Sequence, residues 1–271
     1  MKTTILVPVD FTRVAHNALH YACEISKNNP TEIVAVHLLE KVILDDIKEL
    51  PSNNLVMKKM MERMYKEIIQ KTTNDLTNFV ADLKSTYGDI IRTLISHGSI
   101  FDAFNEVADS YESSLIVMGT HGITGMQHFA GSNAYKIVSN SPKPIFVVQN
   151  RPLSPIETLY FAFKNQSQLA CYSELINELC SYFPCNIIFN ILSEETVFLP
   201  ESLEHLAGKT RFISHHFNHE NIISSAMKEG ADAVGICINE LDCLDSNLYG
   251  MTQEKILANK FEIPVLCLPE R

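Results

Sequence analysis

Short apolar runs alternate with amphipathic stretches along the first 150 residues of the chain. Val14, Ala18, Ala22 and Ile25 form one helical stripe, and Thr12 is placed to cap that helix. Further helices are predicted at residues 52–86, 100–109 and 132–139. Runs of β-type apolar residues predict buried strands at residues 5–9, 33–39, 90–96, 115–118 and 144–148. Nearly all-apolar strands that are each followed by a helix predict a parallel sheet covered on both faces.

The second half of the chain repeats this order more loosely. Strands are predicted at residues 158–163, 186–192, 211–214, 233–238 and 263–268, and helices at 167–180, 221–228 and 253–260. Tyr135-Lys-Ile-Val and Pro144-Ile-Phe-Val correspond to Glu254-Lys-Ile-Leu and Pro264-Val-Leu-Cys. This self-similarity indicates a tandem duplication, and two prolines within residues 150–155 suit a linker. We therefore predict two domains, residues 1–150 and 151–271, each with an open five-stranded parallel sheet.

Length and charge narrow the possible function classes. The chain has 271 residues and a net charge of −10, of which residues 1–150 carry −2 and residues 151–271 carry −8. An acidic balance argues against nucleic acid or an anionic membrane surface as the main partner. No run approaches the ~20 apolar residues of a membrane helix, and the first residues do not read as a signal peptide. We therefore expect a cytoplasmic protein.

A glycine-rich segment follows the fourth predicted strand. Gly119, Gly122, Gly125 and Gly131 fall within thirteen residues, and Gly131-Ser132 then opens a helix. Ligands of open parallel sheets bind outside the carboxyl ends of the strands, and glycines there let backbone amides approach a phosphate. Ser132 and Asn133 can add side-chain donors, and His121 within the loop can add a positioning donor. The segment predicts a phosphate-binding site.

Other phosphate-binding motifs do not match this segment. It has neither the lysine of Gly-x-x-x-x-Gly-Lys-Ser/Thr nor the spacing of Gly-x-Gly-x-x-Gly, and its glycines follow the fourth strand and not the first. The sequence therefore argues against efficient nucleoside triphosphate hydrolysis of the P-loop type and against a dinucleotide-dependent dehydrogenase. Asp10 ends the first strand, where its carboxylate can accept from a ribose hydroxyl or a base amine. A role for Asp10 in starting the helix beside Thr12 stays open.

These residues carry a resemblance to a known family. Gly119-Thr-His-Gly122 followed by Gly131-Ser132 resembles the Gly-x2-Gly-x9-Gly-Ser/Thr loop of universal stress proteins of the UspA type, with eight residues here in place of nine. The segments at residues 5–12, 36–39 and 141–148 resemble the first, second and last strands of that family. The resemblance covers residues 2–149. It implies a Rossmann-like fold of the adenine nucleotide alpha hydrolase type and a bound ATP or related adenine nucleotide, with or without Mg.

The resemblance also implies a set of site residues. The adenine and ribose would lie near Pro8 and Asp10, with a backbone contact from Leu38 to the base. Met118 and Gly119 would lie beneath the ribose and phosphates. The phosphates would be held by Gly122, Gly131, Ser132 and Asn133, with His121 close by.

The second half lacks several of these features. Lys164 aligns with Asp10, and Asp242 and Asp245 stand where the first half has glycines. We therefore predict that residues 151–271 form a degenerate domain that has lost the nucleotide site. Because the family commonly pairs domains through the last strand, the resemblance implies that residues 144–149 and 263–268 pair within one chain. A homodimer is a further option.

Three function classes remain at this point. The first is an ATP-binding sensor of stress or regulation with an unknown protein partner. The second is a slow ATPase or autophosphorylating protein, with Ser132 or Thr124 as acceptor, and the third is a chaperone-like interaction module that binds no nucleotide. His215, His216 and His219 lie close in sequence, but partners at zinc spacing are missing, so no metal site is predicted. No catalytic residue is assigned, and methionines on the helix at 52–86 either pack inward or form a partner surface.

Overall fold

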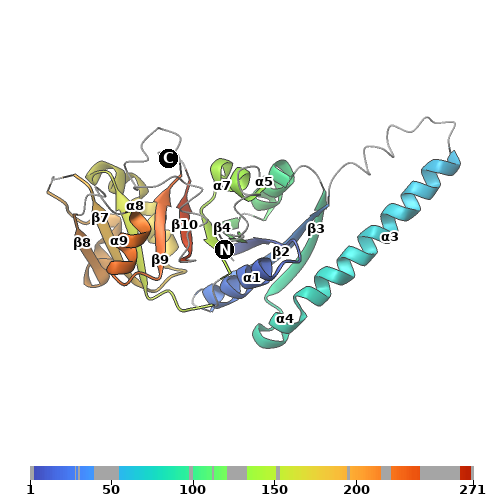
Figure 1. Ribbon diagram of the computed structural model, residues 1–271, viewed down its shortest axis with the longest axis horizontal. Coiled ribbons are helices and arrows are strands. Elements are labelled where there is room, and N and C mark those ends of the chain that lie inside the picture. The colour runs from blue at the N-terminus through green and yellow to red at the C-terminus, as the bar shows by residue number, and fades with distance from the viewer. Residues whose placement is uncertain are drawn as a thin grey trace.

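The fold is built on one continuous sheet of ten strands. In the computed structural model, the described residues are 3–27, 29, 31–39, 55–97, 100–111, 113–120, 133–150, 153–193, 196–214, 221–238 and 263–269. The strand order is β3-β2-β1-β4-β5-β10-β9-β6-β7-β8 (Figure 1). The first half contributes β3-β2-β1-β4-β5, and the second half contributes β10-β9-β6-β7-β8. Read from the outer edge of the sheet inward, both halves have the order third, second, first, fourth and fifth strand.

The first half has five mutually parallel strands, as the apolar runs predict. These are β1 (Thr3–Pro8), β2 (Thr31–Leu39), β3 (Ile91–His97), β4 (Ser113–Gly119) and β5 (Ile145–Val148). The described helices are α1 (Arg13–Ser26), α3 (Leu55–Phe79), α4 (Ala81–Tyr87), α5 (Ile100–Ser110) and α7 (Asn133–Asn140). Thr12 caps α1 as predicted, because its side chain accepts from the amide of Ala15.

The second half has the same strand order, but a 3₁₀-helix replaces the two helices between its second and third strands. Its strands are β6 (Thr158–Phe163), β7 (Asn186–Ile191), β8 (Thr210–Ile213), β9 (Ala233–Cys237) and β10 (Val265–Leu268). They are joined by the helices α8 (Gln166–Cys180) and α9 (Ile222–Lys228) and by the 3₁₀-helix η2 (Glu201–Lys209). The sequence pattern did not predict η2, which stands between the second and third strands, where the first half has α3 and α4. The helix expected at residues 253–260 lies outside the described residues.

The predicted single helix at residues 52–86 is wrong in one respect. It is two helices, α3 and α4, separated at Val80, whose backbone has φ −98° and ψ 0°. Leu76, Val80 and Leu83 are all buried, so the change of direction keeps both helices against the core. Periodicity alone could not show this, because apolar positions continue through the break.

The two halves join through their last strands. β5 and β10 pair antiparallel, with Val147 opposite Val265 and Phe146 opposite Leu266. This confirms the predicted pairing of residues 144–149 with 263–268. All other neighbouring strands in the sheet are parallel, so the junction is the one reversal of strand direction in the described sheet.

Apolar cores cover both faces of the sheet. On one face, α1 and α8 pack over strand residues such as Ile5 and Phe161, and this core spans both halves. On the other, α5, α7 and α9 cover residues such as Leu6 and Tyr160. Successive residues of a strand point to opposite faces, so each apolar run supplies both cores. None of the described helices combines the length and the apolar character needed to cross a membrane.

Helix α3 runs along the β3 edge of the sheet and extends beyond it (Figure 1). Near its start, Met57, Met60 and Met64 are 46%, 60% and 51% exposed. These methionines therefore do not pack on the sheet, and the interpretation of the stripe as inward packing is wrong for them.

Candidate functional site

A pocket of about 200 Å³ opens at the carboxyl ends of β1, β2 and β4. β1 and β4 are neighbours in the sheet, but the chain continues from β1 to β2 on one side and from β4 to β5 on the other. The two connections therefore leave the sheet in opposite directions between β1 and β4. Open α/β sheets form a crevice at such a switch in strand order. The pocket therefore arises from topology before any particular side chain is considered.

The structure brings together five residues that the sequence predicted for a nucleotide site. They come from three separate strand ends and all line the pocket: Pro8, Asp10, Leu38, Met118 and Gly119. The lining also contains five residues that sequence reasoning did not assign: Val9, Ala15, Val36, His37 and Ile137. Of these, Val36 lies in β2 and Val9 directly follows β1, and nothing in the sequence distinguishes them from other core valines.

The loop after β1 fixes the carboxylate of Asp10. Its Oδ1 accepts from the amide and the hydroxyl of Thr12 at 3.0 and 2.6 Å. Asp10 therefore takes part in the start of α1 and also lines the pocket, while its role toward a ribose or base stays a prediction. Among the described residues, no partner bonds its Oδ2, which leaves that oxygen available as an acceptor.

His37 lines the pocket from the end of β2. Its Nδ1 donates to the carbonyl of Val9 at 2.7 Å, which fixes the ring against the end of β1. The ring of Phe11 lies over it at 4.6 Å, and Phe11 has a left-handed backbone with φ 63°. His37 is therefore a hydrogen-bonded residue at the end of β2 and also contributes to the pocket wall.

Gly119 lets the end of β4 approach the first turn of α1. A Cβ on this residue would lie 2.7 Å from the backbone carbon and oxygen of Val14, closer than real Cβ contacts. Only glycine therefore fits this position without moving α1. Because Ala15 of the same turn also lines the pocket, a shift of α1 would change the shape of the pocket.

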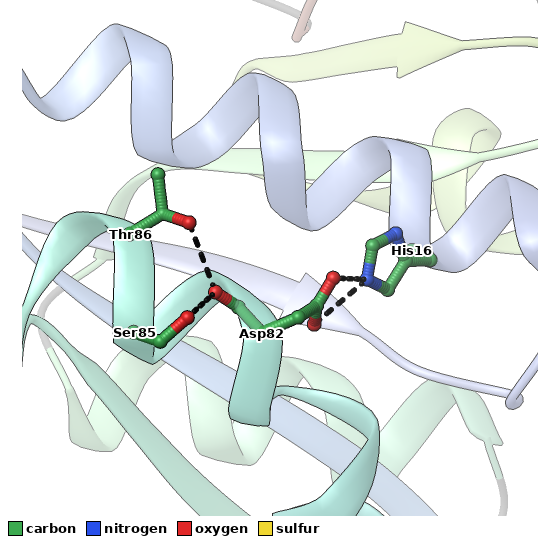
Figure 2. Close-up of polar contacts among 4 residues, drawn as sticks. All are labelled: His16, Asp82, Ser85 and Thr86. Carbon is green, nitrogen blue, oxygen red and sulfur yellow. Dashed lines mark hydrogen bonds and ion pairs between the residues drawn. The ribbon is translucent and has the colours of Figure 1, made fainter.

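Side chains of α3 and α4 contact the loop after β1 and the first turn of α1. The ring of Phe79 contacts Phe11 edge-on at 5.6 Å and His16 at 5.4 Å. Figure 2 shows His16 of α1 facing Asp82 of α4, with Nε2 at 3.1 and 3.2 Å from the two carboxylate oxygens. Partial burial alone would raise the pKa of Asp82, but hydrogen bonds from His16 and from backbone amides lower it overall.

The predicted phosphate loop lies largely outside the described residues. This applies to His121, Gly122, Gly131 and Ser132, and to the side chain of Asn133. The elements on both sides of the loop do border the pocket, through Gly119 at the end of β4 and Ile137 in α7. The role of the loop with phosphate therefore stays a prediction.

The equivalent positions in the second half differ. Leu6 pairs with Ile116 and Tyr160 with Val234. At the middle of the antiparallel junction Phe146 lies opposite Leu266, so these two residues are equivalent, and so are their partners Val117 and Gly235. Counting along the paired strands from there makes Leu6 equivalent to Tyr160 and places Lys164 at the position of Asp10 and Cys237 at the position of Gly119. The register therefore supports the alignment of Lys164 with Asp10. Asp242 and Asp245 lie outside the described residues.

The described residues hold no group of three or more His, Cys, Asp or Glu side chains that could bind a metal ion. His215, His216 and His219 fall outside the described ranges. The chemistry of the described pocket is that of an apolar cleft with one carboxylate. Such a cleft can hold a flat apolar ring and accept a hydrogen bond from a polar group attached to it.

Comparisons with known proteins agree with this architecture. The model of the universal stress protein family matches residues 1–149. Universal stress protein MJ0531 of Methanocaldococcus jannaschii is 25% identical over 146 residues, which cover 54% of this chain and 81% of that protein. Universal stress protein G of Salmonella typhimurium is 30% identical over 59 residues, which cover 22% of this chain and 42% of that protein.

Solved structures extend the similarity to both halves. A universal stress protein from Archaeoglobus fulgidus aligns with a TM-score of 0.60 at 12% identity, over 98% of this chain and 96% of its own. A Pseudomonas aeruginosa protein of unknown function aligns with a TM-score of 0.55 at 12% identity, over 99% and 92% of the two chains. At this level of identity the similarity establishes the fold of the whole chain.

Proposed function

This chain belongs to the universal stress protein family, and we propose that its first half binds an adenine nucleotide, ATP foremost, in the pocket at the ends of β1, β2 and β4. The observation that carries the proposal is the convergence of residues 8, 10, 38, 118 and 119 on one pocket. These positions are more than 100 residues apart at the extremes, and only the fold brings them together.

The lining suits a base and a ribose. Val36, Leu38 and Met118 provide apolar walls for a flat ring, and Asp10 provides an oxygen acceptor for a ribose hydroxyl. Sites that enclose whole ligands usually measure ~300–1,000 Å³, so the described 200 Å³ fits the nucleoside part. The phosphates would then extend over Gly119 toward the glycine-rich segment and the start of α7.

The proposed role is that of a nucleotide-responsive regulatory protein. A ligand against Asp10 and His37 would press on the loop that carries Phe11, and Phe11 contacts Phe79 at the end of α3. Occupancy of the pocket would thereby reach the exposed methionines of α3, for instance Met60. This gives a physical route from a bound nucleotide to a surface that a partner protein could contact.

Calorimetric titration with ATP, with and without Mg²⁺, tests the binding proposal. Asp10→Ala removes the acceptor, and we expect affinity to fall about tenfold or more, because hydrogen bonds to charged groups contribute about 1.5–3 kcal/mol. Asp10→Asn keeps an oxygen for Thr12 and separates ligand binding from the start of α1. Lys164→Ala, at the equivalent position of the second half, is the matched control and should leave affinity unchanged.

Native mass spectrometry of the purified protein identifies the nucleotide that is retained. Co-purified ATP would support a sensor, whereas ADP together with phosphate release would support slow hydrolysis. Unchanged ATP affinity in Asp10→Ala, or the absence of any ATP binding by the wild type, would overturn the proposal.

A further inference from the structure

Exposed apolar side chains are concentrated on the first turns of α3. Val56, Met60 and Met64 follow one another at a spacing of four residues, and Met57 lies beside them on the same face of the helix. Val56 alone is 83% exposed, and five of the eight large apolar side chains that are exposed in the described part of the chain lie between Leu55 and Met64. Single exposed apolar residues are common, whereas a contiguous group of them marks an interaction site.

Basic side chains accompany this apolar group. Residues 55–66 hold four Lys or Arg and one Glu, a net charge of +3 in a chain whose total is −10. Lys59, Arg63 and Lys66 are exposed on the same turns. Arg63 is paired with Glu67 at 3.0 Å, but exposed pairs of this kind contribute at most about 1 kcal/mol, so Arg63 can change its partner. This apolar group with its basic rim, called here the α3 surface, suits a partner that is both apolar and acidic.

A surface of the opposite charge lies at the start of η2. Phe198 is exposed, and both of its backbone groups bond the side chain of Gln166, the amide donating at 3.2 Å and the carbonyl accepting at 2.9 Å. These two bonds hold the segment that carries the ring against the start of α8. Glu201 and Glu204 are exposed three residues apart on η2, a spacing at which side chains of a 3₁₀-helix lie one above the other. Residues 194–204 contain four Glu and no Lys or Arg, and Phe198, Glu201 and Glu204 are called here the η2 surface.

The two surfaces lie at opposite ends of the molecule. α3 runs along β3, one outer strand of the sheet, whereas η2 packs against α8 and against β8, the other outer strand. Figure 1 shows α3 and β8 at the two ends of the long axis. One chain therefore cannot join its own α3 surface to its own η2 surface, and a contact between them has to be made by two copies.

We propose that the α3 surface of one copy docks on the η2 surface of a second copy. The methionines of α3 surround the ring of Phe198, because their flexible side chains adapt to an aromatic ring and pack favourably against it. Lys59 and Arg63 face the carboxylates of η2, and these opposite charges set the orientation of the contact. Two α3 surfaces do not suit each other, since each carries a net charge of +3. The contact is head to tail, so further copies can add unless the assembly closes into a ring.

Sedimentation velocity of the full chain, at rising protein concentration and at low and high salt, tests this association. We expect the average mass to rise above that of one chain with concentration, and to fall at high salt because exposed charges are screened. Lys59→Glu/Arg63→Glu and Glu201→Lys/Glu204→Lys should each weaken the association about tenfold or more, since each places like charges against each other. Glu174→Lys/Glu178→Lys makes the same change of charge at exposed positions of α8 and is the matched control, which should associate like the wild type.

Combined variants show whether the two surfaces contact each other. An equal mixture of the two double variants, and the quadruple variant that carries all four reversals, should both regain the association, because the facing charges are opposite again. Phe198→Ala removes the ring and should weaken the association about tenfold, while the fold keeps its stability because the ring is exposed. Circular dichroism of each variant checks that it is folded. None of these residues lines the nucleotide pocket, so the outcome does not depend on nucleotide binding.

Three results would overturn the proposal. The first is a wild type that stays monomeric at low salt, and binding of that monomer to phosphatidylglycerol vesicles through the α3 surface would then identify an anionic membrane as the occupant. The second is an association that the α3 reversal abolishes and the η2 reversal leaves intact, which would place a different part of the second copy on α3. The third is a lack of recovery in both the mixture and the quadruple variant.

Discussion

The two halves of the sheet share their strand order but differ at the strand ends where a ligand would bind. In the first half, Asp10 and Gly119 border a pocket, whereas Lys164 and Cys237 hold the equivalent positions in the second. The strands need only short continuous runs of apolar residues, which many sequences provide. A binding site needs particular residues at particular ends, so it can be lost while the sheet is kept.

A second difference concerns the connection between the second and third strands of each half. In the first half α3 and α4 fill this connection, and in the second half the short η2 does. Val36 of β2 faces the pocket, while its counterpart Asn190 is fully buried and bonds to Tyr160. The second half has thus exchanged an apolar pocket wall for an internal polar contact.

The largest predicted effect tests whether the halves behave as one folding unit. Phe146 is fully buried at the junction and its ring contacts Tyr21 from the first half and Phe183 from the second. Phe146→Ala should lower the free energy of unfolding by about 3–5 kcal/mol. In urea unfolding followed by circular dichroism, one shifted transition is expected. Phe198→Ala, at a side chain that is 63% exposed, should change stability by less than about 0.5 kcal/mol. Two separate transitions in the wild type would contradict a single unit.

A glycine in each half has a packing role that the other half does not share. A Cβ on Gly119 would meet the Val14 backbone at 2.7 Å, and one on Gly235 would meet the ring of Phe161 at 2.1 Å. Gly119→Ala and Gly235→Ala should each destabilise by about 1–3 kcal/mol through overpacking. Only Gly119→Ala should also weaken ATP binding in calorimetry. Gly208→Ala, with open space around it, is the control, and equal ATP affinity in all three variants would show that Gly119 has no role in the pocket.

The caps of the first helices test a feature that the halves share. Thr12 and Asn165 each accept from a backbone amide of the first turn, and Thr12 also donates its hydroxyl to Asp10. Asn165→Ala should cost about 1 kcal/mol, and Thr12→Ala somewhat more because the Asp10 contact is lost as well. Thermal unfolding measures both, with Thr12→Ser as the variant that restores the hydroxyl. A larger cost at Asn165 would reverse this ranking.

The smallest effect belongs to α4, which has no counterpart in the second half. Asp82 is 65% exposed and bonds His16, so Asp82→Asn should cost at most about 1 kcal/mol at pH 7. Because the pKa of Asp82 is lower in the folded protein, its ionised form stabilises the fold above the ordinary value of 3.8, and this contribution is lost as the pH falls below that value. Urea unfolding at pH 7 and pH 3 should show the difference between wild type and variant shrinking. Asp75→Asn on α3 is the control, and a difference that grows toward pH 3 would contradict the assignment.

Much of the site could be predicted because its residues stand at recognisable sequence positions. Asp10 follows an apolar run directly, and Gly119 opens a segment unusually rich in glycine. His37 and Ile137 could not be found in this way, because their neighbours along the chain look like ordinary core. Their place in the pocket depends on which strand and helix ends meet in space.

The sequence by itself determined the local elements: nearly all described strands, the capped start of α1, and the family to which residues 1–149 belong. Apolar periodicity and capping residues act over a few neighbours, so they can be read from a linear pattern. The tertiary structure alone decided the break at Val80, the presence of η2 and the exposure of the methionines at the start of α3. These could not be read from a linear pattern, because whether an apolar side chain is covered depends on residues far away in the chain.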